Sequence, residues 1–123
     1  MTLFGFEKLE VWQKAIEMTD CVYALTRTFP ADERFGLTSQ MRRASVSVAS
    51  NIAEGSGRGS HPDFARFVEI SYSSLMELLT QSRIANRQGF LAQTNYDDLY
   101  RRSEEIARML SGLRASLNSR GSS

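Results

Sequence analysis

Residues 41–60 read MRRASVSVASNIAEGSGRGS, and this stretch decides the fold. No charged residue lies between Arg43 and Glu54, and small or apolar residues fill most of that interval. Apolar side chains recur at the spacing of one helical face: Leu37, Met41, Ala44, Val48 and Ile52. A helix with almost no polar side is normally enclosed, and small side chains let its neighbours approach closely. We therefore predict the central helix of a bundle, closed by Gly55 in the left-handed conformation.

The same stretch carries a specific motif, RRASVS at 42–47 and NIAEG at 51–55, followed by Gly57 and Arg58. This combination resembles the signature of the bacterial four helix bundle protein family, also called the 23S rRNA intervening-sequence protein family. The signature residues are Arg42, Arg43, Asn51, Glu54 and Gly55. Further matching segments extend the resemblance over nearly the whole chain: FEKLEVWQKA at 6–15, FP at 29–30, GLTSQ at 36–40 and EL at 77–78.

The resemblance implies a four-helix protomer that assembles into a ring of five. Some relatives are retroelement accessory proteins that bind a reverse transcriptase and nucleic acid, so both are candidate partners. Most members of the family have no assigned activity, and the family's name records where its genes were noticed. The family usually has a glycine-serine pair where this chain has Ser73 and Ser74, which keeps the position small without glycine.

Length and composition indicate one ordinary globular domain. The chain has 123 residues, of which 41% are hydrophobic and 24% charged, enough for a core without disulfides or metals. We expect a single domain over residues 1–117 and a frayed tail at 118–123. Cys21 is the lone cysteine, and we find no signal peptide, transmembrane run or lipidation motif, so we expect a cytoplasmic protein that does not enter the membrane.

Helical periodicity occurs in four stretches, at about 8–28, 38–55, 60–88 and 94–117. Joined by short connections, they predict an all-α, antiparallel up-down-up-down four-helix bundle. Capping boxes are expected at Ser60 with Asp63 and at Thr94 with Asp97, because each aspartate follows its hydroxyl residue by three positions. We expect Gly89 to close the third helix. Phe35 is expected to pin the first connection to the core.

More apolar surface is present than one bundle can bury. The second helix lacks a polar face, and the first has two apolar stripes, so we expect self-association into a cyclic homo-oligomer. The subunit number of five comes only from the family resemblance. Three acid-before-base pairs are expected along the fourth helix: Asp97 with Arg101, Asp98 with Arg102, and Glu104 with Arg108.

Residues for catalysis or cofactor binding do not form a recognisable set. His61 is the only histidine, so neither a histidine-rich metal site nor a Cys-His nucleophile is expected. Four glutamates on the third and fourth helices invite comparison with di-iron bundles, but the Glu-x-x-His motifs that those sites need are absent. The glycine-rich segment at 55–59 matches no phosphate-binding motif. We predict no enzyme, no cofactor and no metal.

Two binding hypotheses remain. The leading one is a non-enzymatic scaffold or adaptor that binds a macromolecular partner. The alternative is an RNA- or DNA-binding accessory protein, with candidate contacts from Arg58, Arg101, Arg102 and Arg108 repeated around a ring. Fifteen basic against 14 acidic residues give a net charge of only +1, which disfavours a dedicated nucleic-acid binder. Arg42 and Arg43 are expected to connect the second helix to neighbouring helices or subunits, with contact to nucleic acid as the alternative role.

Overall fold

The computed structural model describes residues 4–121, and within this range the chain forms four α-helices and two short 3-10 helices, without a β-strand. In chain order they are η1 (Gly5–Lys8), α1 (Glu10–Thr26), η2 (Ala31–Glu33), α2 (Leu37–Ser56), α3 (His61–Arg87) and α4 (Gln93–Gly121). The predicted all-α class with four helices is therefore confirmed. Helix α4 runs through residue 121, past the boundary expected at 117, and residues 122–123 lie outside the described range.

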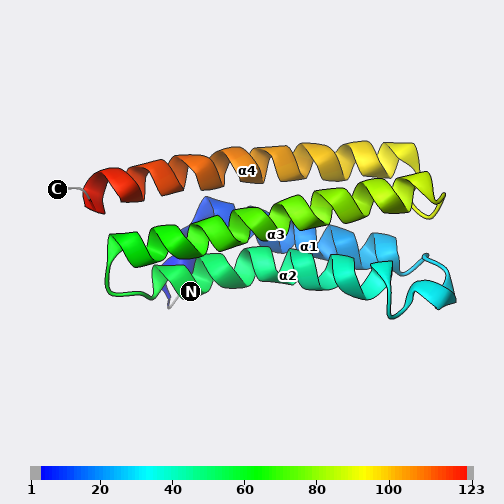
Figure 1. Ribbon diagram of the computed structural model, residues 1–123, viewed down its shortest axis with the longest axis horizontal. Helices are drawn as coiled ribbons and strands as arrows, with labels where there is room; N and C mark the ends of the chain where they lie inside the picture. The colour runs from blue at the N-terminus through cyan, green and yellow to red at the C-terminus, as the bar shows by residue number, and fades with distance from the viewer. Residues whose placement is uncertain (1–3, 122–123) are drawn as a thin grey trace.

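The four long helices lie side by side along one axis (Figure 1). Helix α2 packs against α1 and α3, and α4 packs against α3 and α1, so each helix has two neighbours. The most extensive packing is between α2 and α3. The core lies along the shared axis and contains the stripes that the periodicity predicted, including Met18, Met41, Leu75 and Leu110, all fully buried.

Buried serines allow the helices of this core to approach closely without leaving polar groups unsatisfied. The Ser71 hydroxyl donates a hydrogen bond of 2.8 Å to the carbonyl of Val48, which connects α3 to α2. The Ser82 hydroxyl donates to Leu78 within α3 at 2.7 Å. Because each hydroxyl is paired, the small residue brings close packing without the cost of an orphaned polar group.

Gly55 has a different role from the one that the sequence suggested. It lies inside α2, which ends at Ser56, and it does not adopt the left-handed conformation. It is buried against α3, where an added Cβ would lie 2.7 Å from the Cβ of Phe67 and 2.9 Å from Cδ1 of Phe64. Glycine is needed here for the close approach of two helices, and the prediction of a left-handed cap was wrong.

The left-handed cap occurs instead at the end of α3. Gly89 has φ of 82° and is the only residue of the described chain with a positive φ. The Gly89 amide donates to the carbonyl of Asn86, and the Phe90 amide donates to that of Ala85, the two bonds of a Schellman motif. The predicted closure of the third helix at Gly89 is confirmed.

The two predicted helix starts have different outcomes. Ser60 is the N-cap of α3, and its side chain accepts a hydrogen bond from the Asp63 amide, which confirms the predicted cap. The Asp63 carboxylate contacts Arg66, so the reciprocal half of the predicted capping box is not formed. Helix α4 begins one residue before Thr94, so Thr94 is not its N-cap. The Asp97 carboxylate instead accepts a hydrogen bond of 2.9 Å from Gln93 Nε2, within the first turn of α4.

Phe35 is also placed differently from the prediction. Its side chain is 87% exposed, so it does not hold the first connection against the core. Nor is α2 fully enclosed, since Arg43, Val46 and Ser50 are exposed along its outer side. The sequence correctly placed the buried face of α2 but missed this exposed strip, because small and apolar residues occur on both sides of the helix.

Candidate functional site

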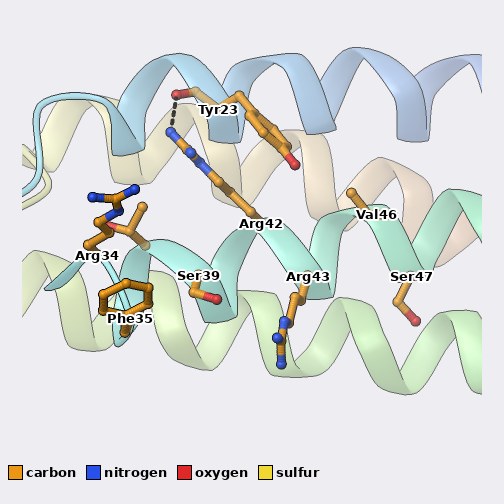
Figure 2. Close-up of a pocket in the computed structure, with 9 residues that line it drawn as sticks. Tyr23, Arg34, Phe35, Ser39, Arg42, Arg43, Val46 and Ser47 are labelled. Atoms are coloured by element: carbon orange, nitrogen blue, oxygen red, sulfur yellow. Dashed lines mark hydrogen bonds between the residues drawn. The ribbon is translucent and has the colours of Figure 1, made fainter.

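An open groove of about 580 Å³ lies where α2 meets α1. Figure 2 shows the side chains around it, which come from α1, from the turn before α2 and from the first half of α2. The lining includes two aromatic rings, a valine and three arginines: Tyr23, Phe35, Val46, Arg34, Arg42 and Arg43. Among residues 4–121, no carboxylate lines this groove. It therefore combines an apolar floor with an uncompensated positive charge.

Arg42 connects α2 to α1 without the help of an acidic residue. Its Nε donates to the Thr26 hydroxyl at 2.9 Å, and its Nη2 donates to the Tyr23 carbonyl at 3.5 Å. The guanidinium lies 4.6 Å from the centroid of the Tyr23 ring, within the range of a cation–π interaction. Arg42 therefore has a structural role between two helices, which is one of the two roles that the sequence suggested.

Arg43 is placed quite differently from its neighbour. Figure 2 shows the two side chains leaving α2 in different directions, with Arg42 reaching toward Tyr23 and Arg43 pointing away from α1. Arg43 is exposed and forms no ion pair within the described residues. Its guanidinium is thus available to a carboxylate from outside this chain.

Phe35 and Arg34 stand together at the end of the groove. The Arg34 guanidinium lies 5.4 Å from the centroid of the Phe35 ring, and the ring itself is largely in solvent. An exposed aromatic ring beside an arginine is a common anchor in protein interfaces, because the ring offers a large apolar area and the guanidinium offers hydrogen-bond donors.

A second, smaller groove of about 270 Å³ follows the other side of α2, against α3. Arg43 and Glu77 both line it, and the hydroxyls of Ser47 and Ser74 meet at 2.8 Å between the helices. Asn51 donates to the Ser47 carbonyl at 2.8 Å, one turn earlier in α2. Small residues of α2 and α3 therefore leave an open groove between these two helices.

The four arginines proposed from the sequence for nucleic acid do not gather on one surface. Arg58 lies in the α2–α3 loop, whereas the other three are on α4, which begins at the opposite end of the bundle (Figure 1). Each is paired with a carboxylate: Arg58 with Glu54 at 4.0 Å, Arg101 and Arg102 with Asp98 at 3.4 and 3.0 Å, and Arg108 with Glu104 at 3.7 Å. The predicted Asp97–Arg101 pair does not form, because Asp98 holds both arginines.

These ion pairs perturb one carboxyl group. Hydrogen bonding from the Arg102 guanidinium, with smaller contributions from its charge and from Arg101, lowers the pKa of Asp98 below its ordinary value. The same contact raises the pKa of Arg102. Burial raises the pKa of the half-buried Cys21 thiol, which makes it a poor nucleophile at neutral pH.

Three of the four glutamates considered for a metal site are held in ion pairs: Glu69, Glu104 and Glu105. Glu69 pairs with Arg114 at 2.8 Å, and Glu105 pairs with Lys14 at 3.2 Å. Within residues 4–121, no three histidine, cysteine or acidic side chains lie close enough together to hold a metal ion. His61 is exposed at the first residue of α3. No helix of the described chain is both long enough and apolar enough to cross a membrane.

These features define an all-α, four-helix protein with an apolar, arginine-flanked surface along its second helix. The chain belongs to the 23S rRNA-intervening sequence protein family, because the sequence model of that family matches residues 7–112. A similar fold occurs in the crystal structure of a protein with unknown function from the S23 ribosomal protein family of Bacteroides thetaiotaomicron VPI-5482, with a TM-score of 0.78 and 21% identity. That likeness covers 85% of this chain and 97% of the other, and it shows the fold alone. No curated protein matches the chain at a significant level.

Proposed function

We propose that this protein is a non-enzymatic scaffold or adaptor that works as a cyclic homo-oligomer and binds a macromolecular partner. The observation that carries the proposal is the apolar surface that a lone protomer leaves in water. Four side chains on α2, α3 and the turn before α2 are well exposed: Phe35 at 87%, Ile84 at 45%, Val46 at 42% and Ile70 at 39%. Exposed apolar groups spread over more than one face favour association through two different surfaces.

The protomer that we propose is an up-down-up-down bundle. The pairings between α1 and α2 support it, because Thr19 bonds to Ser45 while Thr26, further along α1, bonds to the earlier residue Arg42. Such pairings are those of two antiparallel helices. A head-to-tail contact between two different faces of this bundle closes into a ring. The family resemblance supplies the number five, and we place the protein in the cytoplasm because its single cysteine suits a reducing compartment.

Size-exclusion chromatography coupled to light scattering tests the assembly. Five chains of 13.9 kDa give a particle of about 70 kDa. A species near the mass of one or two chains at every concentration would reject the proposal. An enzymatic role would need a convergent set of nucleophile, base or metal ligands, and the contacts described above do not supply one.

Nucleic-acid binding is the alternative function. The observation in its favour is that Arg101 and Arg108 are highly exposed, and the ion pairs that hold them are long, at 3.4 and 3.7 Å. Exposed pairs of this kind contribute little to stability, so either guanidinium is free to exchange its carboxylate for a phosphate. Binding of this type is indifferent to sequence and weakens steeply as the salt concentration rises.

A further inference from the structure

We infer that one surface of the ring contact is the outer side of α2 and that the matching surface is the acidic side of α1 on the next copy. This inference rests on the proposed homo-oligomer and names its two faces. The first face, the α2 strip, consists of Phe35, Ser39, Arg43, Val46 and Ser50. The second face, the α1 acidic face, consists of Glu10, Glu17 and Asp20.

The α2 strip has the composition of an interface. Phe35 and Val46 are apolar and exposed, while Ser39 and Ser50 are small enough for another helix to approach closely. Grooves of about 580 and 270 Å³ lie along its two sides, so an incoming helix would find space for its own side chains. An interface of this kind needs an apolar centre with charged residues at the edge, which Arg34 and Arg43 provide.

Charge complementarity selects the α1 acidic face as the occupant. Glu10, Glu17 and Asp20 are exposed and form no ion pair within 4.0 Å among residues 4–121. Glu17 lines a small pocket together with Lys14 and Arg102, and its charge acts on Arg102. Most carboxylates on α3 and α4 already have basic partners: Asp63, Glu69, Asp98, Glu104 and Glu105. Of the other two, Asp97 accepts a hydrogen bond from Gln93, and Glu77 lines the α2–α3 groove beside Arg43 of its own chain. Three unpaired acids thus match two unpaired arginines, Arg34 and Arg43.

The register of the helices makes this match compatible with a ring. Thr19 of α1 bonds to Ser45 of α2, so Asp20 lies at nearly the same height along the bundle as Val46. Arg43 is three residues from Val46, about 4.5 Å along the axis at the rise of an α-helix. A rotation about an axis parallel to the helices preserves these heights. Asp20 of one copy would therefore meet Arg43 of the next within the reach of an arginine side chain.

The directions of the two faces also fit. Helices α1 and α2 are neighbours in a bundle in which each helix has two neighbours, so their outward sides diverge by roughly a right angle. A contact between two faces set at such an angle rotates each subunit relative to the previous one, so that the series of subunits closes into a ring. Faces on opposite sides of the bundle would instead build an open filament.

Charge reversal tests the pairing. We would prepare Arg43→Glu, Asp20→Arg and the double variant, and measure mass by light scattering and folding by circular dichroism. Each single variant places like charges across every contact, and the double variant restores opposite charges whatever the number of subunits. Arg108→Glu, at an exposed arginine of α4, is the matched control.

We expect the wild-type chain and the Arg108→Glu control to be oligomers, both single variants to shift toward 13.9 kDa with unchanged helicity, and the double variant to recover the oligomer. A wild-type monomer would overturn the proposed homo-oligomer and this inference with it. A wild-type oligomer that survives both single variants would overturn only the pairing. The pairing would also be overturned if Arg43→Glu abolished binding of a single-stranded RNA probe without changing the mass. The α2 strip would then be a nucleic-acid surface.

Discussion

Replacing Gly55 with alanine tests the close contact between α2 and α3. In an open helix, alanine is more favourable than glycine by about 1 kcal/mol. At Gly55 the new Cβ would lie 2.7 Å from the Cβ of Phe67 and 3.3 Å from the carbonyl oxygen of Phe64. Neither atom can move by a side-chain rotation, so relief requires the helices to separate. Overpacking typically costs about 1–3 kcal/mol, and we expect the upper half of that range here.

The expected net effect of Gly55→Ala is a loss of about 1–2 kcal/mol in the free energy of unfolding. Gly112 offers a matched control, because it lies within α4 and an added Cβ there meets no atom within 4 Å. Gly112→Ala should therefore stabilise the protein by up to about 1 kcal/mol. Urea unfolding followed by circular dichroism, at equal protein concentrations, measures both variants. The reasoning would be refuted if Gly55→Ala stabilised the chain as much as Gly112→Ala.

Three further outcomes are expected. Ala49→Leu should lower stability by about 1–3 kcal/mol in thermal unfolding, because Ala49 is buried in the core and a larger side chain there overpacks it; unchanged stability and oligomer size would contradict this. The lowered pKa of Asp98 adds stability above its ordinary pKa of 3.8 that disappears as the pH falls through the folded-state value, so Asp98→Asn should show a shallower acid decline in urea titrations. An identical decline in both proteins would count against the Arg102 contact. If the protein binds RNA, Arg101→Ala/Arg102→Ala should weaken that binding in fluorescence anisotropy at low salt, and unchanged affinity would exclude this part of α4.

The buried face of each helix was predictable because it depends on a local repeat. The spacing of Met41, Val48 and Ile52 already fixes which side of α2 is apolar, and all three are fully buried. The Ser60 cap and the Gly89 closure were predictable for the same reason, since each depends on a few consecutive residues.

Other features depend on contacts between distant segments, and the sequence pattern misled there. Gly55 looked like a helix end, but it is required by Phe64 and Phe67 of the next helix. Phe35 looked like a core residue because aromatic rings are usually buried, yet the connection before α2 holds it in solvent. Neither outcome follows from the local sequence, because each is decided by the position of another segment.

The candidate surface was only partly predictable. The sequence drew attention to Arg42 and Arg43, yet it could not show that Arg42 turns inward to Tyr23 while Arg43 stays unpaired. The predicted pairs of Arg102 with Asp98 and of Arg108 with Glu104 are confirmed, whereas Arg101 pairs with Asp98 and not with Asp97 as predicted. Which charged side chains lack a partner can be decided only from the positions of all the residues around them.

Native mass spectrometry of the wild-type protein tests the central claim, a closed ring, most directly. Closure covers every contact surface, so the account predicts one discrete assembly, five times the 13.9 kDa chain mass, over a wide range of concentrations. A monomer at micromolar concentration, or a ladder of masses that grows with concentration, would contradict it.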